Sequence, residues 1–154
     1  MISEFLKKEA IFTNVNVEAG TKEAALKEIS ALNAEVSGVN ADTLYKLFAN
    51  REDLDSTGFG SEIAIPHAKV EGYKGGMIGI TKFSSPIEWD SIDGEPVTTT
   101  INLIMPGDDA GNTHLTVISS LMRKLVHQDF IDGLKSLEDA NDIYDYIIRE
   151  MEEK

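Results

Sequence analysis

The sequence predicts an α/β fold in which helices cover a β-sheet of mixed strand direction. Strand-like apolar runs gather in the middle of the chain, amphipathic helical patterns lie before and after them, and no repeat or Pro/Ser-rich linker interrupts the 154 residues. A helix with one apolar face must bury that face, and a central sheet provides the matching surface. We expect one domain over residues 1–154, because a chain of about 150 residues buries roughly 68–70% of its unfolded surface.

The first third of the chain predicts a short helix, a strand and two longer helices. Residues 3–10 fit a short helix, and residues 11–17 alternate between apolar and polar side chains as a strand does. Thr21 opens an amphipathic helix, and Gly38 closes it at the position where a left-handed backbone is common. A second helix begins near Asn40.

The middle of the chain predicts three strands. These are residues 62–68, 77–83 and 98–105, which are rich in β-branched and apolar side chains. Glycine-rich residues 72–76 and the turn-rich residues 84–96 separate them. We therefore expect a strand-rich centre between two helical regions.

The last third predicts helices. A long helix is expected over residues 113–127, and a short one over residues 129–135. The predicted apolar stripe of the long helix is Leu115, Ile118, Leu121, Met122 and Leu125. Ser136 and Asp139 fit a capping box for the final helix.

The composition argues against several classes of function. With 14 Lys and Arg against 27 Asp and Glu, the formal charge of −13 disfavours binding to nucleic acid or anionic lipid and favours a protein partner with a basic patch. The absence of cysteine excludes disulfides, thiolate nucleophiles and Cys-ligated metals. No apolar run is long enough to span a bilayer, and the first residues lack a signal-peptide pattern, so we expect a cytoplasmic protein without direct membrane insertion.

His67 is the first candidate for chemistry. It ends a strand-like run after Ile65 and Pro66, and proline restricts both its own backbone and that of the preceding residue. The imidazole is therefore expected on a stiff support. A neutral imidazole is a good nucleophile near pH 7, because its unperturbed pKa is about 6.5. The alternative is a surface histidine at a strand end.

Arg51 and the segment from Ser56 to Gly60 are candidates for anion binding. A guanidinium holds an oxyanion through two parallel hydrogen bonds, although Arg51 is equally placed to cover a helix end with its charge in water. Two glycines this close permit a concave run of backbone N–H groups, so Thr57, Gly58 and Gly60 are predicted to bind phosphoryl oxygens. A helix exit with turn glycines has the same pattern.

His114 lies in the first turn of the predicted long helix. The N-terminus of a helix attracts anions and disfavours protonation of a nearby imidazole; a capping or core role is the alternative. A metal site would have to combine His67 and His114 with Asp108 or Asp109, but no compact ligand motif such as His-x-x-x-His is present. We therefore expect no metal and no cofactor.

The combination of these segments resembles the fructose/mannitol-type enzyme IIA of the bacterial phosphoenolpyruvate-dependent sugar phosphotransferase system, over essentially the whole chain. Two departures are small: Phe59 stands where the family usually has Ile, and Glu62 where Gly is common. The segments that carry the resemblance are Arg51-Glu52, Ser56-Thr57-Gly58-Phe59-Gly60, Ile63-Ala64-Ile65-Pro66-His67, Leu103-Ile104-Met105-Pro106 and His114-Leu115.

The resemblance implies a three-layer α/β/α sandwich with a central mixed sheet. It also implies that His67 accepts a phosphoryl group from the phosphocarrier protein HPr and passes it to a IIB component, with the membrane component IIC on another chain. His114 maps as the active-site neighbour of His67, and Arg51 as the motif arginine. Arginine, backbone N–H groups and a helix N-terminus are able to stabilise phosphoryl transfer without a metal.

Two other interpretations stay open. A nitrogen-type regulatory enzyme IIA has the same phosphohistidine but controls other proteins, and sequence motifs do not separate it from the sugar-transport type. A metal-dependent hydrolase is more remote. The transported sugar is not encoded in this chain, because selectivity resides chiefly in the membrane component.

Overall fold

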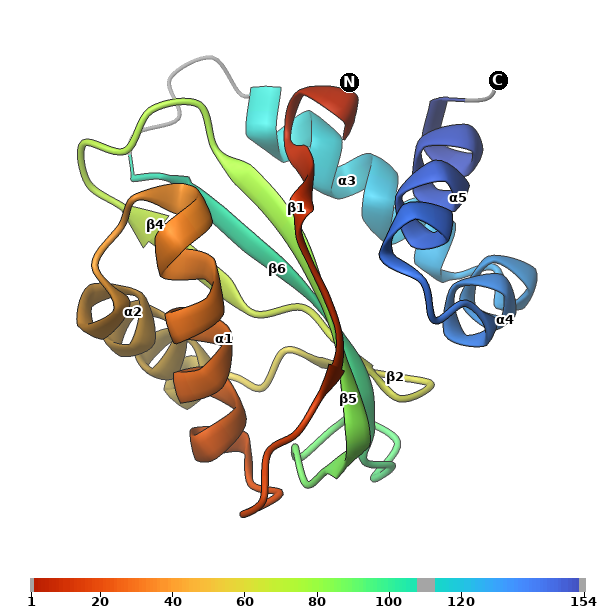
Figure 1. Ribbon diagram of the computed structural model, residues 1–154, viewed down its shortest axis with the longest axis horizontal. Helices are drawn as coiled ribbons and strands as arrows, with labels where there is room; N and C mark the ends of the chain where they lie inside the picture. The colour runs from red at the N-terminus through yellow and green to blue at the C-terminus, as the bar shows by residue number, and fades with distance from the viewer. Residues whose placement is uncertain (1, 108–112, 153–154) are drawn as a thin grey trace.

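Two layers of helices enclose a central β-sheet (Figure 1). The computed structural model describes residues 2–107 and 113–152, with the backbone alone at residues 113 and 114. The strands are β1 (Leu6–Val15), β2 (Gly58–Gly60), β3 (Ile63–Ala64), β4 (His67–Val70), β5 (Met77–Ile87) and β6 (Val97–Pro106). The helices are α1 (Lys22–Ser37), α2 (Ala41–Leu54), α3 (Thr113–Leu125), α4 (Gln128–Ser136) and α5 (Ala140–Glu152). Helices α1 and α2 cover one face of the sheet, and α3, α4 and α5 cover the other.

The sheet has mixed strand direction. Its order is β1-β5-β6-β3-β2, and β4 also pairs with β6. The pairs β1/β5, β3/β6 and β4/β6 are parallel, whereas β5/β6 and β2/β3 are antiparallel. The strands predicted over residues 77–83 and 98–105 are confirmed as β5 and β6, which are both longer than predicted. The expected α/β/α sandwich with a mixed sheet is thereby confirmed.

Each face of the sheet has its own apolar core. On β6, Leu103 and Met105 pack with α3, α4 and α5, whereas Ile104 packs with α1 and α2. Successive side chains of a strand point to opposite faces, which is why one strand contributes to both cores. A strand buried on both faces is apolar along most of its length, and residues 101–105 have this character apart from one asparagine.

Helix α1 begins and ends, and helix α2 begins, where the sequence predicts. Thr21 caps α1, because its Oγ1 accepts a hydrogen bond from the Ala24 N–H at 3.2 Å. Gly38 ends α1 with a φ of 81°, in the left-handed region. Asn40 caps α2 by accepting a hydrogen bond from the Thr43 N–H at 3.1 Å. These boundaries follow from local chemistry alone.

The N-terminal segment is a strand, and the helix predicted over residues 3–10 is wrong. A short 3-10 turn, Ile2–Glu4, precedes β1, which runs parallel to β5. Three exposed residues, 7–9, interrupt the alternation of buried side chains, and the pairing register shifts across them. Pairing with β5 therefore decides the conformation of residues 6–10, which the local pattern does not reveal. The strand predicted over residues 11–17 corresponds to the second half of β1, which ends at Val15.

The strand predicted over residues 62–68 is two short strands, β3 and β4, separated by Ile65 and Pro66. Proline has no N–H to give to a β-ladder, so this position breaks the strand. Pro66 pairs with β6 through its carbonyl, which accepts a hydrogen bond from the Leu103 N–H at 2.9 Å. As a result, His67 begins β4 and does not end a strand.

The long helix predicted over residues 113–127 is confirmed as α3, but part of its predicted buried stripe is wrong. Leu115 is 59% exposed and Met122 is 37% exposed. The buried side chains of the helix are Val117, Leu121 and Leu125. Because apolar residues occur on two sides of this helix, their spacing alone does not indicate which side meets the sheet.

The predicted capping box of the last helix is also wrong. Asp139 caps α5 by itself, since its Oδ2 accepts a hydrogen bond from the Asp142 N–H at 3.1 Å. Ser136 still belongs to α4, where its hydroxyl donates to the Gly133 carbonyl at 2.8 Å. The short helix predicted over residues 129–135 is confirmed as α4. Because α4 extends to Ser136, this residue does not cap α5.

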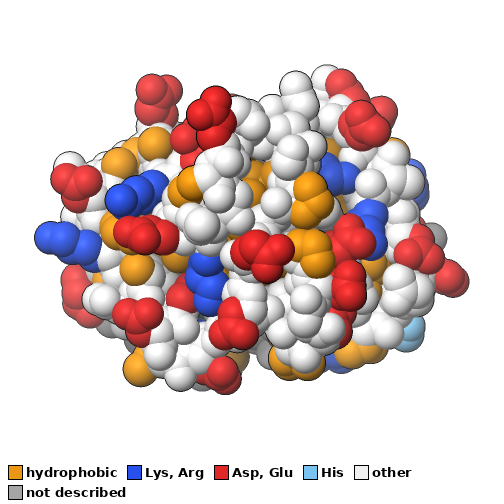
Figure 2. Space-filling view, turned by 90° about the horizontal axis from the view of Figure 1, so that it is seen from below, with side chains coloured by type: hydrophobic (Ala, Val, Ile, Leu, Met, Phe, Trp, Pro, Cys, Tyr) orange, Lys and Arg blue, Asp and Glu red, His pale blue; other side chains and the backbone are white. Residues whose placement is uncertain are grey.

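The described surface reflects the acidic composition. Figure 2 shows Asp and Glu side chains spread over one face of the molecule, with fewer Lys and Arg side chains among them. None of the described helices is long and apolar enough to cross a membrane. The charge on this face is consistent with the overall value of −13.

Two leucines of α3 provide a matched test of which side of the helix is buried. Leu121 is 2% exposed, so Leu121→Ala should lower the free energy of unfolding by about 2–5 kcal/mol. Leu115→Ala, at 59% exposure, should change it by less than about 0.5 kcal/mol. Urea unfolding of both variants measures the difference, and equal effects would contradict the assignment of the buried side.

Candidate functional site

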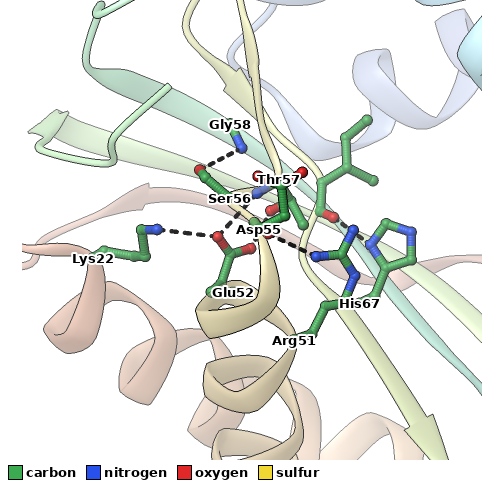
Figure 3. Close-up of polar contacts among 9 residues, drawn as sticks. Lys22, Arg51, Glu52, Asp55, Ser56, Thr57, Gly58 and His67 are labelled. Atoms are coloured by element: carbon green, nitrogen blue, oxygen red, sulfur yellow. Dashed lines mark hydrogen bonds and ion pairs between the residues drawn. The ribbon is translucent and has the colours of Figure 1, made fainter. Parts of the chain in front are cut away.

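His67 is held next to the central strand, because it is the first residue of β4 and pairs with Leu103 of β6. Its side chain is half-buried, and its Nδ1 lies 2.6 Å from the carbonyl oxygen of Ile65 (Figure 3). A carbonyl oxygen only accepts hydrogen bonds, so Nδ1 must carry the proton and donate it. In the neutral ring, Nε2 then has a free lone pair and no proton.

The surroundings of His67 favour the neutral ring. Burial is the main reason that the pKa of His67 lies below its ordinary value of 6.5, and the positive charge of Arg51 also lowers this pKa. The hydrogen bond to the Ile65 carbonyl and the negative charge of Glu52 act in the opposite direction, but the net shift of the pKa is downward. Nε2 is thus available as a nucleophile at neutral pH.

Arg51 lies in the last turn of α2, beside the imidazole of His67 (Figure 3). Its Nη1 donates a hydrogen bond to the Asp55 carbonyl at 2.7 Å, which fixes the guanidinium over the end of the helix. A guanidinium has five N–H donors, so this contact uses only part of its capacity. Arg51 therefore covers the helix end and places a positive charge next to the candidate nucleophile, and its binding of an oxyanion stays a prediction.

Glu52 is the central polar residue of the site, and the sequence reasoning assigned it no role. Its carboxylate is buried and accepts three hydrogen bonds: from Lys22 Nζ at 3.2 Å, from the Thr57 N–H at 3.0 Å and from the Thr57 hydroxyl. The spacing of α2 contained a signal for this burial. Leu44, Phe48 and Glu52 follow one another at intervals of one helical turn and share the buried side of the helix.

Two N–H groups of the predicted phosphoryl-binding loop, those of Thr57 and Gly58, already have hydrogen-bond partners within the chain. The N–H of Thr57 is bound to Glu52, and the N–H of Gly58 donates to the Ser56 hydroxyl at 3.0 Å. Gly58 is instead needed for close packing, because a Cβ at this position would lie 2.7 Å from the Cα of Ser91. A phosphoryl group would reach the N–H groups of Thr57 and Gly58 only by displacing these hydrogen bonds, so binding of phosphoryl oxygens there stays a prediction.

Gly60 and Phe59 both have structural contacts. Gly60 lies in β2 with a φ of 110°, and the Asp93 carboxylate lies beside it. Phe59 is half-buried and packs against the core under α3, α4 and α5. The exposed apolar side chains close to this segment are Leu54 and Ile92; Leu54 ends α2, and the Ile92 N–H donates to the Gly58 carbonyl at 3.3 Å.

The other predicted site residues fall partly outside the described residues. The backbone of His114 lies in the first turn of α3, as expected, but its side chain is outside the described part, and so are Asp108 and Asp109. The structure therefore does not test the proximity of His114 to His67. Among the described residues, no three His, Asp or Glu side chains gather in an arrangement able to hold a metal ion.

Relatives of this chain include both regulatory and transport proteins. It is 33% identical over 135 residues to a nitrogen regulatory protein of Pseudomonas aeruginosa, covering 87% of each chain. It is 31% identical over 147 residues to the fructose-specific EIIABC component of Bacillus subtilis, covering 95% of this chain and 23% of that much longer one. The crystal structure of the nitrogen regulatory protein IIA-Ntr from Neisseria meningitidis superposes with a TM-score of 0.83 at 27% identity, covering 95% of this chain and 98% of the other.

The match to the family itself covers nearly the whole chain. Residues 4–150 fit the family described as phosphoenolpyruvate-dependent sugar phosphotransferase system, EIIA 2. This match agrees with the resemblance that the segments around Arg51 and His67 carry. The chain belongs to the type 2 enzyme IIA family of the phosphoenolpyruvate-dependent phosphotransferase system.

Proposed function

We propose that this chain is a regulatory phosphocarrier of the nitrogen type, which accepts a phosphoryl group on His67 and controls other proteins through its phosphorylation state. The observation that carries the phosphocarrier assignment is the hydrogen bond from His67 Nδ1 to the Ile65 carbonyl, because it leaves Nε2 unprotonated. The similarity to nitrogen regulatory proteins over most of both chains supports the regulatory role.

The proposed transfer needs no base at His67. The lone pair of Nε2 attacks the phosphorus of a donor phosphohistidine, the N–P bond of the donor breaks, and an N–P bond to Nε2 forms. The ring of His67 gains positive charge as this bond forms, and the Ile65 carbonyl, 2.6 Å from Nδ1, stabilises that charge. The same charge makes the ring a better leaving group when an acceptor removes the phosphoryl group.

Two further residues have proposed roles in this step. Arg51 stabilises the oxygens of the transferring phosphoryl group, because its guanidinium lies beside His67 and phosphoryl transfer depends mainly on positioning and charge. His114 is proposed to donate a hydrogen bond to the same oxygens, since its backbone lies at the N-terminus of α3, where the helix dipole favours the neutral ring. The family resemblance supports both assignments.

The proposed donor is the phosphocarrier protein HPr or a close relative of it. Leu54 and Ile92, which are 83% and 88% exposed, offer apolar contacts next to the segment that follows α2. Acidic residues such as Asp53 and Asp55 adjoin them, so a donor with a basic surface around its histidine fits by charge. Phe59 of the same segment packs against the core and is less accessible for such a contact.

Feeding a IIB component of a sugar transporter is the second candidate function. It is favoured by the similarity to the fructose-specific EIIABC component over 95% of this chain. The chemistry at His67 is the same in both functions, and they differ in the acceptor. Experiments on the acceptor therefore distinguish them, whereas experiments on the histidine do not.

The phosphorylation site is tested by incubation with phosphoenolpyruvate, enzyme I and HPr. We expect a single phosphoryl group on His67, stable in base and labile in acid, as a phosphoramidate is. Mass spectrometry of base-stabilised peptides locates the group, and His67→Ala should remove it. His127→Ala is the control, because His127 lies at the start of α4, on a different element. Full labelling of His67→Ala would contradict the assignment.

The acceptor is tested by following radiolabelled phosphoryl groups from the phosphorylated protein. We expect slow transfer to a purified fructose-specific IIB, because a regulatory carrier does not pass its phosphoryl group to a transporter. Return of the label to HPr should be efficient, because it is the reverse of the donor reaction. Return to HPr serves as the control for a competent protein. Transfer to IIB as fast as the return to HPr would favour the sugar-transport function over the regulatory one.

The pKa of His67 is testable by NMR titration of the imidazole. The midpoint should lie below 6.5, because burial and the charge of Arg51 disfavour the protonated ring. Arg51→Gln removes that charge and should raise the pKa, whereas Arg51→Lys preserves it. Since the folded-state pKa is lowered, stability is complete above the unfolded value of 6.5 and falls as pH drops from 6.5 to the folded pKa. A wild-type midpoint at or above 6.5 would contradict this electrostatic account.

A further inference from the structure

The carboxylate of Glu52 joins three parts of the chain that are distant in sequence. It lies near the end of α2, accepts hydrogen bonds from both the N–H and the hydroxyl of Thr57, and forms an ion pair with Lys22 at the start of α1 (Figure 3). Only 3% of its side chain is exposed, and that of Lys22 is 23% exposed. The ammonium of Lys22 also lies 5.7 Å from the centre of the Trp89 ring.

A continuous chain of hydrogen bonds leads from this carboxylate to His67. Glu52 accepts the N–H of Thr57, and the carbonyl of the same Thr57 accepts the N–H of Ile65 at 3.1 Å. The carbonyl of Ile65 then accepts the proton of His67 Nδ1 at 2.6 Å. The N–H and the carbonyl of one residue belong to two planar peptide groups joined at its Cα, so these hydrogen bonds together restrict the φ and ψ angles of Thr57 and Ile65 and thereby the direction of the Ile65 carbonyl.

Stability alone is a weak explanation for this arrangement. Burying a carboxylate costs about as much hydration free energy as its ion pair returns, so a buried pair is a poor source of stability. A buried carboxylate with all its hydrogen bonds made instead favours one particular conformation of the segments that bind it. Here it specifies the conformation of the segment between α2 and β3, on which the ring of His67 depends.

We infer that Glu52 is a positioning residue for His67: by fixing Thr57, it orients the Ile65 carbonyl that holds the imidazole proton on Nδ1. This inference rests on the proposed function of His67 as phosphoryl acceptor. The tautomer is decisive because an unconstrained histidine favours the proton on Nε2, and a protonated Nε2 in a neutral ring has no lone pair for attack. Lys22 has a supporting role, since it compensates the charge of the buried carboxylate.

The test compares Glu52→Ala with Glu52→Gln. Alanine removes every contact with Thr57, whereas the glutamine amide accepts from the Thr57 N–H with its oxygen and donates to the hydroxyl with its nitrogen. The ¹⁵N chemical shifts of the His67 ring report which nitrogen carries the proton, and rapid-quench kinetics give the rate of phosphorylation by phospho-HPr. We expect Glu52→Ala to move the proton toward Nε2 and to slow phosphorylation about ten- to a hundredfold, and Glu52→Gln to restore most of both.

A second pair of variants covers the case in which Glu52→Ala does not fold. Thr57→Val removes only the hydroxyl that donates to Glu52 and preserves the backbone, and Thr57→Ser preserves the hydroxyl as well. Thr57→Val should shift the tautomer in the same direction, and Thr57→Ser should reverse most of the shift. Leu121→Ala, which weakens the core on the opposite side of the sheet, controls for a general loss of stability and should leave the tautomer unchanged.

The two readouts separate this inference from the proposed function. An unchanged tautomer in Glu52→Ala and in Thr57→Val would overturn the positioning role, whatever the rates. The same shift in Leu121→Ala would also overturn it, because the effect would then follow stability. A wild-type protein without phosphorylation at His67 would overturn the proposed function, and the tautomer would still decide the role of Glu52.

Discussion

The structure depends on the pairing of β6 with three other strands. This strand is antiparallel to β5 on one side and parallel to β3 and β4 on the other, and apart from Thr98 its side chains are buried. Because backbone N–H and C=O groups in the interior have to be paired, β6 determines where its neighbours lie. Its pairing with His67 places the histidine at the start of β4, while Pro66 bridges the interval between β3 and β4.

The site combines this rigid strand pairing with the end of one helix. Arg51 and Glu52 are adjacent in sequence but point to different partners: Arg51 lies beside His67, and Glu52 is buried under the following segment. In a chain with a net charge of −13, the local positive charge of Arg51 favours the neutral ring. A phosphocarrier needs such an environment, because its histidine must be a nucleophile when it accepts the phosphoryl group and a leaving group when it releases it.

The family relationship leaves open which protein accepts the phosphoryl group in the proposed function. Regulatory and transport relatives both align with most of this chain, so the similarity by itself does not separate the two functions. The two proposed functions differ in which protein would dock beside His67. Leu54 and Ile92, exposed around the segment after α2, are the places where that difference is expected to act, because exposed apolar side chains supply much of the energy of protein association.

Local chemistry determined the caps of α1 and α2, the long apolar strands β5 and β6 and the candidates His67 and Arg51, because these follow from side chains close in sequence. Contacts between distant segments decided the rest. Pairing with β5 made the N-terminal segment a strand. Packing against the sheet buried Leu121 of α3 and left Leu115 exposed. Hydrogen bonds from Lys22 and Thr57 hold the buried carboxylate of Glu52. A periodic pattern shows that a face is apolar, but only the neighbouring element determines which face is buried and which polar group has a partner there.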